Sequence, residues 1–310
     1  MDNTTALVFG YGELGITAVE TLVNLGTQVV GLVIPSNRNG LDIELIKSFA
    51  AQRGMLLFMQ PSRKRSAPFI RQLRKLNPDI ILVWSYSMIL PPEAIEVPRL
   101  GCINLHGGLL PEYRGAHVMQ WAIINGENET GATLHYIDED IDTGPIIADM
   151  RFQITQDDNA VSVRQKLKNT GIHLLNDWWM AIVSGVAPRI SQDESKAKYY
   201  RLRTPEDGLI DWSISNTNIY NHIRALVSPW PGAFTFSQEQ KIIIWDAKPL
   251  EDSTKGLPPG LIQNMEDSTM CVVTGKGDLL IHKVEVNNVI GSPNILRAIG
   301  TSIGDLLGEF

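Results

Sequence analysis

Short apolar runs alternate with amphipathic stretches along the first half of the chain. The apolar runs occupy residues 5–10, 29–34, 80–84 and 101–104. Between them, the segment up to about residue 25 and the segment 41–50 carry apolar side chains at helical spacing. Unbroken apolar runs of this length are typical of parallel strands buried on both faces. We therefore predict an α/β fold, a doubly wound (Rossmann-like) parallel sheet, for the N-terminal part.

The pattern changes near residue 200. Before it, residues 118–124 and 160–178 read as helices, the second capped by Asp157, Asp158 or Asn159, and residues 131–136 and 146–152 read as strands. The polar segment 188–199 is interpreted as a linker. Beyond it, short strands at 234–236, 242–245, 270–273 and 279–282 suit a small barrel. We predict a first domain over residues 1–195 and a smaller β-rich, OB-like domain over residues 200–310.

Composition narrows the class of protein. The 310 residues are 44% hydrophobic and 20% charged, with two cysteines and a net charge of −7. No apolar run reaches the roughly 20 residues that span a bilayer, and the N-terminus lacks a signal-peptide pattern. We expect a cytoplasmic protein without membrane insertion. Nucleic-acid binding depends on clustered basic residues, so the acidic balance argues against it. The basic cluster at residues 63–65, 71, 74 and 75 is interpreted as a solvated helix face.

A glycine motif follows the first predicted strand. Gly10, Tyr11 and Gly12 begin a Gly-x-Gly-x-x-Gly pattern at the point where a dinucleotide fingerprint is found. That fingerprint also needs an acidic residue about 20 positions later, and the second strand ends in Pro35-Ser36-Asn37 instead. Arg38 would suit a 2′-phosphate, which keeps an NADP-binding protein as an alternative. The plainer interpretation is a tight strand-to-helix turn that offers an anion site.

The residues with the clearest chemistry lie at 104–106 and 142. Asn104 and His106 are two positions apart, so they share one face of an extended strand end, and Asp142 lies in an Asp-Thr-Gly turn. Acyl transfer to an amine needs a proton carrier, an oxyanion donor and a group that orients the carrier. Imidazole, amide and carboxylate supply these three functions. By spacing alone, an Asn-x-His pair is more often an ordinary turn and Asp before Thr-Gly is a common turn residue, and the other five histidines are interpreted as structural or surface residues.

The surrounding sequence decides between these interpretations. "INLHGGLLPEYRG" followed by "QWAIINGENETGATLHYIDEDIDTG" closely resembles the formyltransferases that use 10-formyltetrahydrofolate. "PDIILVWSYSMILP" resembles their folate-pocket loop, and "RTPEDGLIDWS" with "IRALVSPWPGAFTF" resembles the start of their C-terminal domain. The resemblance runs from the first strand to about residue 245. It implies that Asn104, His106 and Asp142 are the catalytic triad, with no metal required.

The resemblance also implies the ligands. The pterin would bind around Ser87, Met88 and Ile89, with the loop of Asp138, Glu139, Asp140 and Ile141 closing over it. The turn at Gly10, Tyr11 and Gly12 would contact the nucleotide. Within the family, the chain most resembles sugar-nucleotide N-formyltransferases, in particular the formyltransferase part of the enzyme that acts on UDP-4-amino-4-deoxy-L-arabinose. That enzyme carries Ser in place of Gly108 and a folate-associated Arg in place of Ala116. No dehydrogenase domain is appended here, which predicts a stand-alone version.

We therefore predict transfer of formyl from 10-formyltetrahydrofolate to the primary amine of a nucleotide-linked amino sugar, for surface polysaccharide such as lipopolysaccharide. In this prediction His106 carries the proton, Asn104 stabilises the oxyanion, and Asp142 orients His106 and favours its protonated form. The expected partners are the nucleotide sugar and a second copy of the chain in a homodimer, without nucleic acid. The alternatives are a methionyl-tRNA formyltransferase, an NADP-dependent oxidoreductase and a non-catalytic folate or nucleotide sensor.

Overall fold

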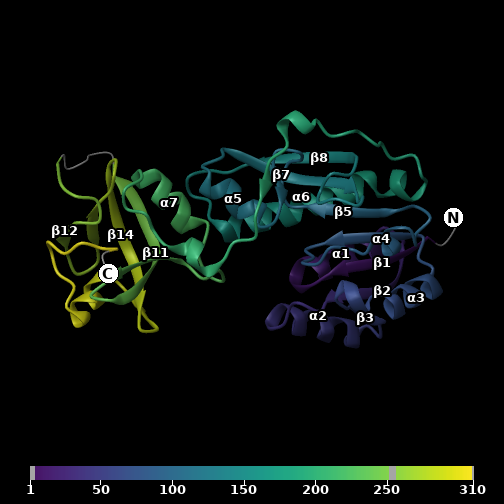
Figure 1. Ribbon diagram of the computed structural model, residues 1–310, viewed down its shortest axis with the longest axis horizontal. Helices are drawn as coiled ribbons and strands as arrows, with labels where there is room; N and C mark the ends of the chain where they lie inside the picture. The colour runs from purple at the N-terminus through teal and green to yellow at the C-terminus, as the bar shows by residue number, and fades with distance from the viewer. Residues whose placement is uncertain (1–3, 251–255, 309–310) are drawn as a thin grey trace. The chain divides into compact units, whose positions relative to one another are not determined.

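The computed structural model describes residues 4–250 and 256–308 (Figure 1). The chain forms two compact units. The first consists of Met1–Val118, Thr130–Phe152 and Gln165–Tyr200, and the second of Met119–Glu129, Gln153–Arg164 and Arg201–Phe310. The domain bounds 1–195 and 200–310 stay a prediction. No helix among the described residues combines the length and the apolar character needed to cross a membrane.

The first unit is built on a seven-stranded sheet in the order β3-β2-β1-β4-β5-β7-β8. The strands β1, β2, β3, β4 and β5 are parallel, and β7 runs antiparallel to β5. Their bounds are β1 Thr5–Gly10, β2 Gln28–Pro35, β3 Leu57–Gln60, β4 Ile80–Trp84, β5 Cys102–His106, β7 Glu129–Tyr136 and β8 Ile146–Gln153. The doubly wound α/β sheet is thus confirmed. Because β7 is antiparallel, the sheet is mixed, and the direction of β7 decides which of its residues pair with those of β5.

Helices cover both faces of this sheet. On one face, the side chains of Phe9 and Val83 pack with the apolar residues of α3 and α4. On the other face, Gly171 of α6 lies against Trp84 and Leu105. The helices of this unit are α1 Gly12–Asn24, α2 Leu41–Gln52, α3 Ala67–Leu76, α4 Pro92–Ile95 and the part of α6 Ala160–Val183 from Gln165 onward, whereas all but the first residue of α5 Val118–Ile124 belongs to the second unit. At the start of α6, Asn159 accepts the backbone N–H groups of residues 161 and 162, which confirms a cap in the predicted run.

The segment interpreted as a linker makes ordered contacts within the first unit. It contains the 3₁₀ turn η2 Glu194–Lys196 and the short strand β9 Tyr199–Tyr200, which pairs in parallel with β6 Arg114–Gly115. β6 follows β5 directly in the chain. Residues 198 and 200 are therefore tied by backbone hydrogen bonds to the segment that follows Asn104 and His106.

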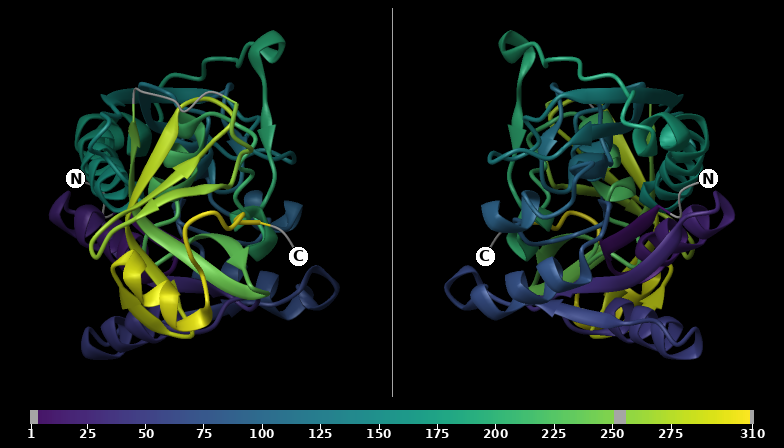
Figure 2. Two further views of the ribbon diagram at one scale, coloured as in Figure 1. Left: turned by 90° about the vertical axis from the view of Figure 1, so that its left-hand side faces the viewer. Right: turned by 90° about the vertical axis from the view of Figure 1, so that its right-hand side faces the viewer.

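The second unit carries an antiparallel sheet (Figure 2, left). Its strand order is β10-β11-β14-β13-β12, with β15 added on β14, and its core contains the fully buried Ile242, Val272 and Leu279. The bounds are β10 Ala233–Ser237, β11 Gln240–Leu250, β12 Ile262–Met265, β13 Met270–Val273, β14 Asp278–Val286 and β15 Val289–Gly291, with α7 Asn216–Arg224, η3 Pro205–Gly208 and η4 Pro293–Ile299. A separate β-rich C-terminal part is thus confirmed.

Candidate active site

β5 presents Asn104 and His106 on the same face, two positions apart, as the strand geometry requires. His106 is 7% exposed. Behind it, Thr133 of β7 donates to the Gly108 carbonyl at 2.7 Å and accepts the Leu110 N–H at 3.2 Å. Two hydrogen bonds therefore fix the loop after β5 to the neighbouring strand β7.

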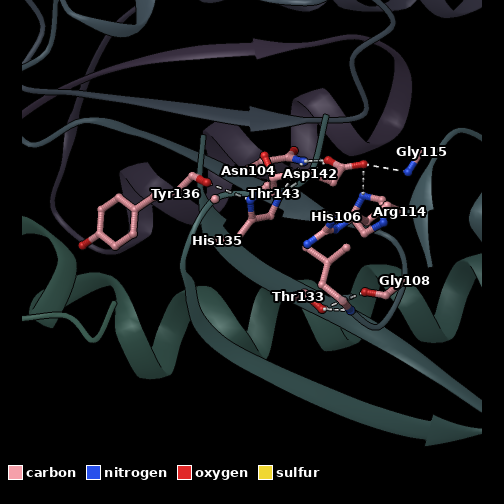
Figure 3. Close-up of polar contacts among 12 residues, drawn as sticks. Asn104, His106, Gly108, Arg114, Gly115, Thr133, His135, Tyr136, Asp142 and Thr143 are labelled. Carbon is pink, nitrogen blue, oxygen red and sulfur yellow. Dashed lines mark hydrogen bonds and ion pairs between the residues drawn. The ribbon is translucent and has the colours of Figure 1, made fainter. Parts of the chain in front are cut away.

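Asp142 approaches these residues from the loop between β7 and β8 (Figure 3). Its Oδ1 accepts the Asn104 Nδ2–H at 3.3 Å, its Oδ2 lies 3.6 Å from His106 Nδ1, and the same Oδ2 accepts the Gly115 N–H at 2.9 Å. The backbone of Asp142 is left-handed, with a φ of 56°. Gly144, two residues later, has no room for a side chain, because a Cβ there would lie 1.8 Å from the Tyr136 carbonyl oxygen.

The carboxyl group of Asp142 is ionised in this environment. Burial by itself would raise its pKa, but the adjacent His106 ring and the Gly115 N–H favour the charged form and hold the pKa well below its usual range. The side chain is only 12% exposed, so solvent screens these interactions weakly. The site therefore contains a fixed negative charge beside His106.

The hydrogen bonds of His106 define its proton-bearing nitrogens. Nε2 lies 2.6 Å from the carbonyl oxygen of Tyr113, which is only an acceptor, so Nε2 carries a hydrogen and donates it. A neutral His106 therefore has its free lone pair on Nδ1, the nitrogen that faces Asp142. Proton gain and loss at this ring take place at Nδ1, beside the carboxylate.

His135 lies in the candidate site, where the sequence interpretation does not place it. Its side chain is 2% exposed, with Nε2 3.1 Å from Asn104 Nδ2 and 3.6 Å from Asp142 Oδ1 (Figure 3). Its Nδ1 lies 2.8 Å from the Tyr136 carbonyl oxygen and donates to it, which leaves Nε2 as the acceptor of the neutral ring. Only the antiparallel register, which pairs His135 with Asn104, reveals this contact.

These contacts fix the orientation of the Asn104 amide. The carboxylate of Asp142 and Nε2 of neutral His135 both accept, so the amide nitrogen, not the oxygen, points toward them. Both N–H groups of Asn104 are thereby engaged. An oxyanion would have to replace one of the two acceptors in order to receive a hydrogen bond from this amide.

The two loops predicted to hold folate lie on different elements of the first unit. Ser87 bonds through its hydroxyl and carbonyl oxygens to the Asn37 side chain, and Gln60 donates to the Ile89 carbonyl at 2.8 Å. The side chain of Ile89 is 70% exposed and that of Ile141 is 49% exposed. Asp138, Glu139 and Asp140 are also exposed, and Asp138 accepts the Thr143 hydroxyl. Both loops thus present apolar side chains on anchored backbone, and the second adds acceptors.

The glycine turn lies at the start of α1, with Tyr11 as its N-cap residue. A Cβ on Gly10 would lie 2.6 Å from the Trp84 carbonyl oxygen, and one on Gly12, where φ is 61°, would lie 2.8 Å from Asp42 Oδ1. The turn is therefore shaped by close packing against β4 and α2. The guanidinium of Arg38 lies 6.0 Å from the Tyr11 ring centroid, but the Asp42 carboxylate beside Gly12 makes the turn less favourable for a phosphate.

Comparison with known proteins identifies the family. The formyl transferase model matches residues 24–177, and the model of the formyl transferase C-terminal domain matches residues 203–294. A methionyl-tRNA formyltransferase from Pelotomaculum thermopropionicum is 33% identical over 97% of both chains. The chain belongs to the formyl transferase family. These sequence matches confirm the predicted resemblance to formyltransferases.

Two further similarities extend this result. The bifunctional polymyxin resistance protein ArnA of Wigglesworthia glossinidia brevipalpis is 34% identical over 93% of this formyltransferase, which spans only 44% of ArnA. The structure of an N-formyltransferase from Helicobacter canadensis, in complex with folinic acid and dTDP-3-aminofucose, has a TM-score of 0.69 and 17% identity, covering 91% of this chain and all of that one. At this low identity, the second similarity establishes the fold.

Proposed function

We propose that this formyltransferase moves a formyl group from 10-formyltetrahydrofolate to the primary amine of a nucleotide-linked amino sugar. The observation that carries the proposal is the convergence of Asn104, His106 and ionised Asp142 within 3.3–3.6 Å in a member of this family. We include in the proposal a homodimer and a product used in surface polysaccharide. The first is tested by light scattering of the purified chain.

The exposed loops at 87–89 and 138–141 fit the formyl donor. A pterin combines an apolar ring surface with amino and ring N–H donors, and these loops combine Ile89 and Ile141 with the carboxylates of residues 138–140. When bound, 10-formyltetrahydrofolate supplies an activated formyl group. The role of the chain is to hold that group beside β5, to manage protons and to stabilise charge.

His106 would manage the proton. Its Nε2–H is held by the Tyr113 carbonyl, so Nδ1 takes the proton that the attacking amine must lose, and the imidazolium then faces the Asp142 carboxylate. The same Nδ1–H is available to protonate the departing nitrogen. A positioned proton carrier of this kind contributes about 10²–10⁴-fold to a rate.

Asn104 would stabilise the negative charge that builds on the formyl oxygen. One of its N–H groups must leave its present acceptor, and the neutral Nε2 of His135 is the weaker acceptor of the two because Asp142 is charged. We therefore propose that the oxyanion replaces His135 as the partner of Asn104. A donor of this type contributes about 10²–10³-fold.

The sugar acceptor is supported by charge and by two relatives. The net charge of −7 is unfavourable for a polyanion such as tRNA, and the exposed acidic loop at 138–140 would attract the protonated amine of an amino sugar. ArnA is among the sequence relatives, and the Helicobacter canadensis enzyme was solved with a nucleotide-linked amino sugar. These observations favour a nucleotide-linked amino sugar as the acceptor.

A methionyl-tRNA formyltransferase is the second candidate, for two specific reasons. A relative of that name matches 97% of both chains. In addition, six basic residues lie exposed between residues 63 and 75, in a stretch without Asp or Glu from residue 55 to residue 78, which offers a surface for phosphates. The family membership leaves the NADP-dependent oxidoreductase without an observation in its favour.

A formylation assay separates the two acceptors. The protein is mixed with 10-formyltetrahydrofolate and either a panel of UDP-, dTDP-, GDP- and CMP-linked amino sugars or charged initiator tRNA, and products are read by mass. We expect one added formyl group on a sugar. Formylation of the tRNA alone would replace the sugar with the second candidate; in that case the double variant Arg71→Glu with Arg74→Glu would weaken tRNA formylation strongly.

A further inference from the structure

The segment just before residue 200 reaches the catalytic aspartate through one side chain. The Nε2 of Gln192 donates to the carbonyl oxygens of Asp142 and Gly144, both at 2.8 Å. These are the two ends of the Asp-Thr-Gly turn. The turn has a left-handed residue at 142 and a backbone contact at 144 that excludes any side chain. A non-glycine residue adopts that conformation only where its surroundings hold it there.

Arg114 holds Gln192 in turn. Its Nε and Nη2 donate to Gln192 Oε1 at 3.1 and 2.8 Å, and its remaining N–H groups reach both carboxylate oxygens of Glu194 and the Tyr199 hydroxyl. The guanidinium donors are all used, and the side chain is completely buried. Because Arg114 has only donors, Oε1 must face it and Nε2 must face the turn. The orientation of the Gln192 amide is therefore fixed by chemistry.

The three residues 113, 114 and 115 then contact the site in three different ways. The Tyr113 carbonyl accepts from His106 Nε2, the Arg114 side chain orients Gln192, and the Gly115 N–H donates to Asp142 Oδ2. The N–H groups of Arg114 and Ala116 point the other way, to the carbonyls of residues 198 and 200. This pairing of β6 with β9 keeps the two segments in register.

We infer that Gln192 is a positioning residue of the formyl-transfer reaction: it holds the 142–144 turn so that the Asp142 carboxylate faces His106 and the Gly115 N–H. The inference rests on the proposed function and deepens it. It assigns a role in catalysis to a segment whose composition reads as a linker. The side-chain hydrogen bonds of Gln192 go to the two ends of the 142–144 turn and to Arg114, so we expect it to act through the position of Asp142.

The test compares Gln192→Ala, Gln192→Glu and the control Ser191→Ala, an exposed neighbour outside these contacts. Glu keeps an acceptor for Arg114 but has no N–H for the turn. We expect kcat to fall about 10²-fold in both Gln192 variants, because a shift of about 1 Å costs that much, while KM for donor and amine stays within twofold. A structural role through Arg114 alone predicts that Glu restores the rate, and that result would overturn the inference.

Two further measurements keep the test decisive. In an Asp142→Asn background, adding Gln192→Ala should change kcat less than twofold, because both act through the same carboxylate; additive losses contradict the inference. If the wild-type chain formylates no amine in the panel, the proposed function fails. The inference is then judged by crystal structures of the wild type and Gln192→Glu: a carboxylate that still meets the Gly115 N–H in the variant overturns it.

Discussion

The glycine turn at residues 10–12 and the 104–142 site both lie in the first unit, and both carry a sequence motif with a known chemical use. At the glycine turn, the missing side chains are explained by the close approach of Trp84 and Asp42. At the 104–142 site, four polar side chains converge, and their hydrogen bonds assign a tautomer to each of the two histidines and an orientation to the Asn104 amide. This difference shows that a motif indicates a functional site when its polar side chains contact other polar side chains. It indicates close packing when neighbouring atoms leave no room for a side chain.

The largest fall in kcat is expected from a substitution in the 104–142 site. His106→Ala removes the group that exchanges the proton, so we expect kcat to fall about 10³–10⁴-fold with donor binding unchanged. The matched control is His173→Ala, an exposed histidine of α6, which should keep the wild-type rate. Rates are read by mass spectrometry of the formylated acceptor, and donor binding by fluorescence quenching. A near wild-type rate for the His106 variant would remove this residue from the proposed mechanism.

His135→Ala tests whether the site includes the residue that the sequence interpretation missed. The change leaves a buried N–H of Asn104 without its acceptor, which costs about 1–3 kcal/mol of unfolding free energy. We expect that loss in urea unfolding, together with a fall in kcat of about tenfold, smaller than that for His106. If stability falls and kcat does not, His135 supports the fold of the site but not its reaction.

The pH dependence of stability should reveal the ionised carboxylate. The pKa of Asp142 is lower in the folded chain than its usual value of about 3.9, so the folded state binds fewer protons. Its stabilising contribution is complete above about pH 4 and is lost as the pH falls through the lowered folded value. The difference in unfolding free energy between the wild type and Asp142→Asn should therefore shrink between pH 6 and pH 3. A constant difference would contradict a lowered pKa.

The smallest effect is expected at the glycine turn. Tyr11→Phe keeps the ring beside Arg38 and removes only the hydroxyl. If that hydroxyl contacts the nucleotide, its loss should raise KM for the nucleotide sugar by less than about tenfold, the value of one neutral hydrogen bond. The kcat should not change. A fall in kcat comparable to that of His106→Ala would place the turn in the chemistry and would end the contrast between the two regions.

The sequence pattern predicted the elements whose burial is one-sided or complete. The runs at 5–10, 29–34 and 80–84 match β1, β2 and β4 within one residue at each end, because fully buried parallel strands are continuously apolar. The pattern did not distinguish β3, whose four residues are mostly half-exposed on the edge of the sheet, or α7, which has few apolar residues. Short edge strands and polar helices carry little periodic signal.

The site divides in the same way. Asn104, His106 and Asp142 were predicted from residue type and family resemblance, and the structure brings all three together. Their proposed roles remain to be tested by the variants above. His135 and Gln192 gave no local signal, because His135 meets Asn104 31 positions away in the chain and Gln192 meets Asp142 50 positions away. Only the register of β7 and the course of the 190–200 segment place them.

The sequence by itself determined the family, the α/β class and the three chemical groups of the triad, because these depend on residue type and on local periodicity. The tertiary structure alone decided how the groups are oriented. The direction of β7, the left-handed turn at Asp142 and the position of the Tyr113 carbonyl assign the hydrogens of His106, His135 and Asn104, and the path of the segment that carries Gln192 brings a donor to that turn. Hydrogen-bond partners belong to the folded backbone, and no single segment of sequence specifies which distant acceptor a donor will meet.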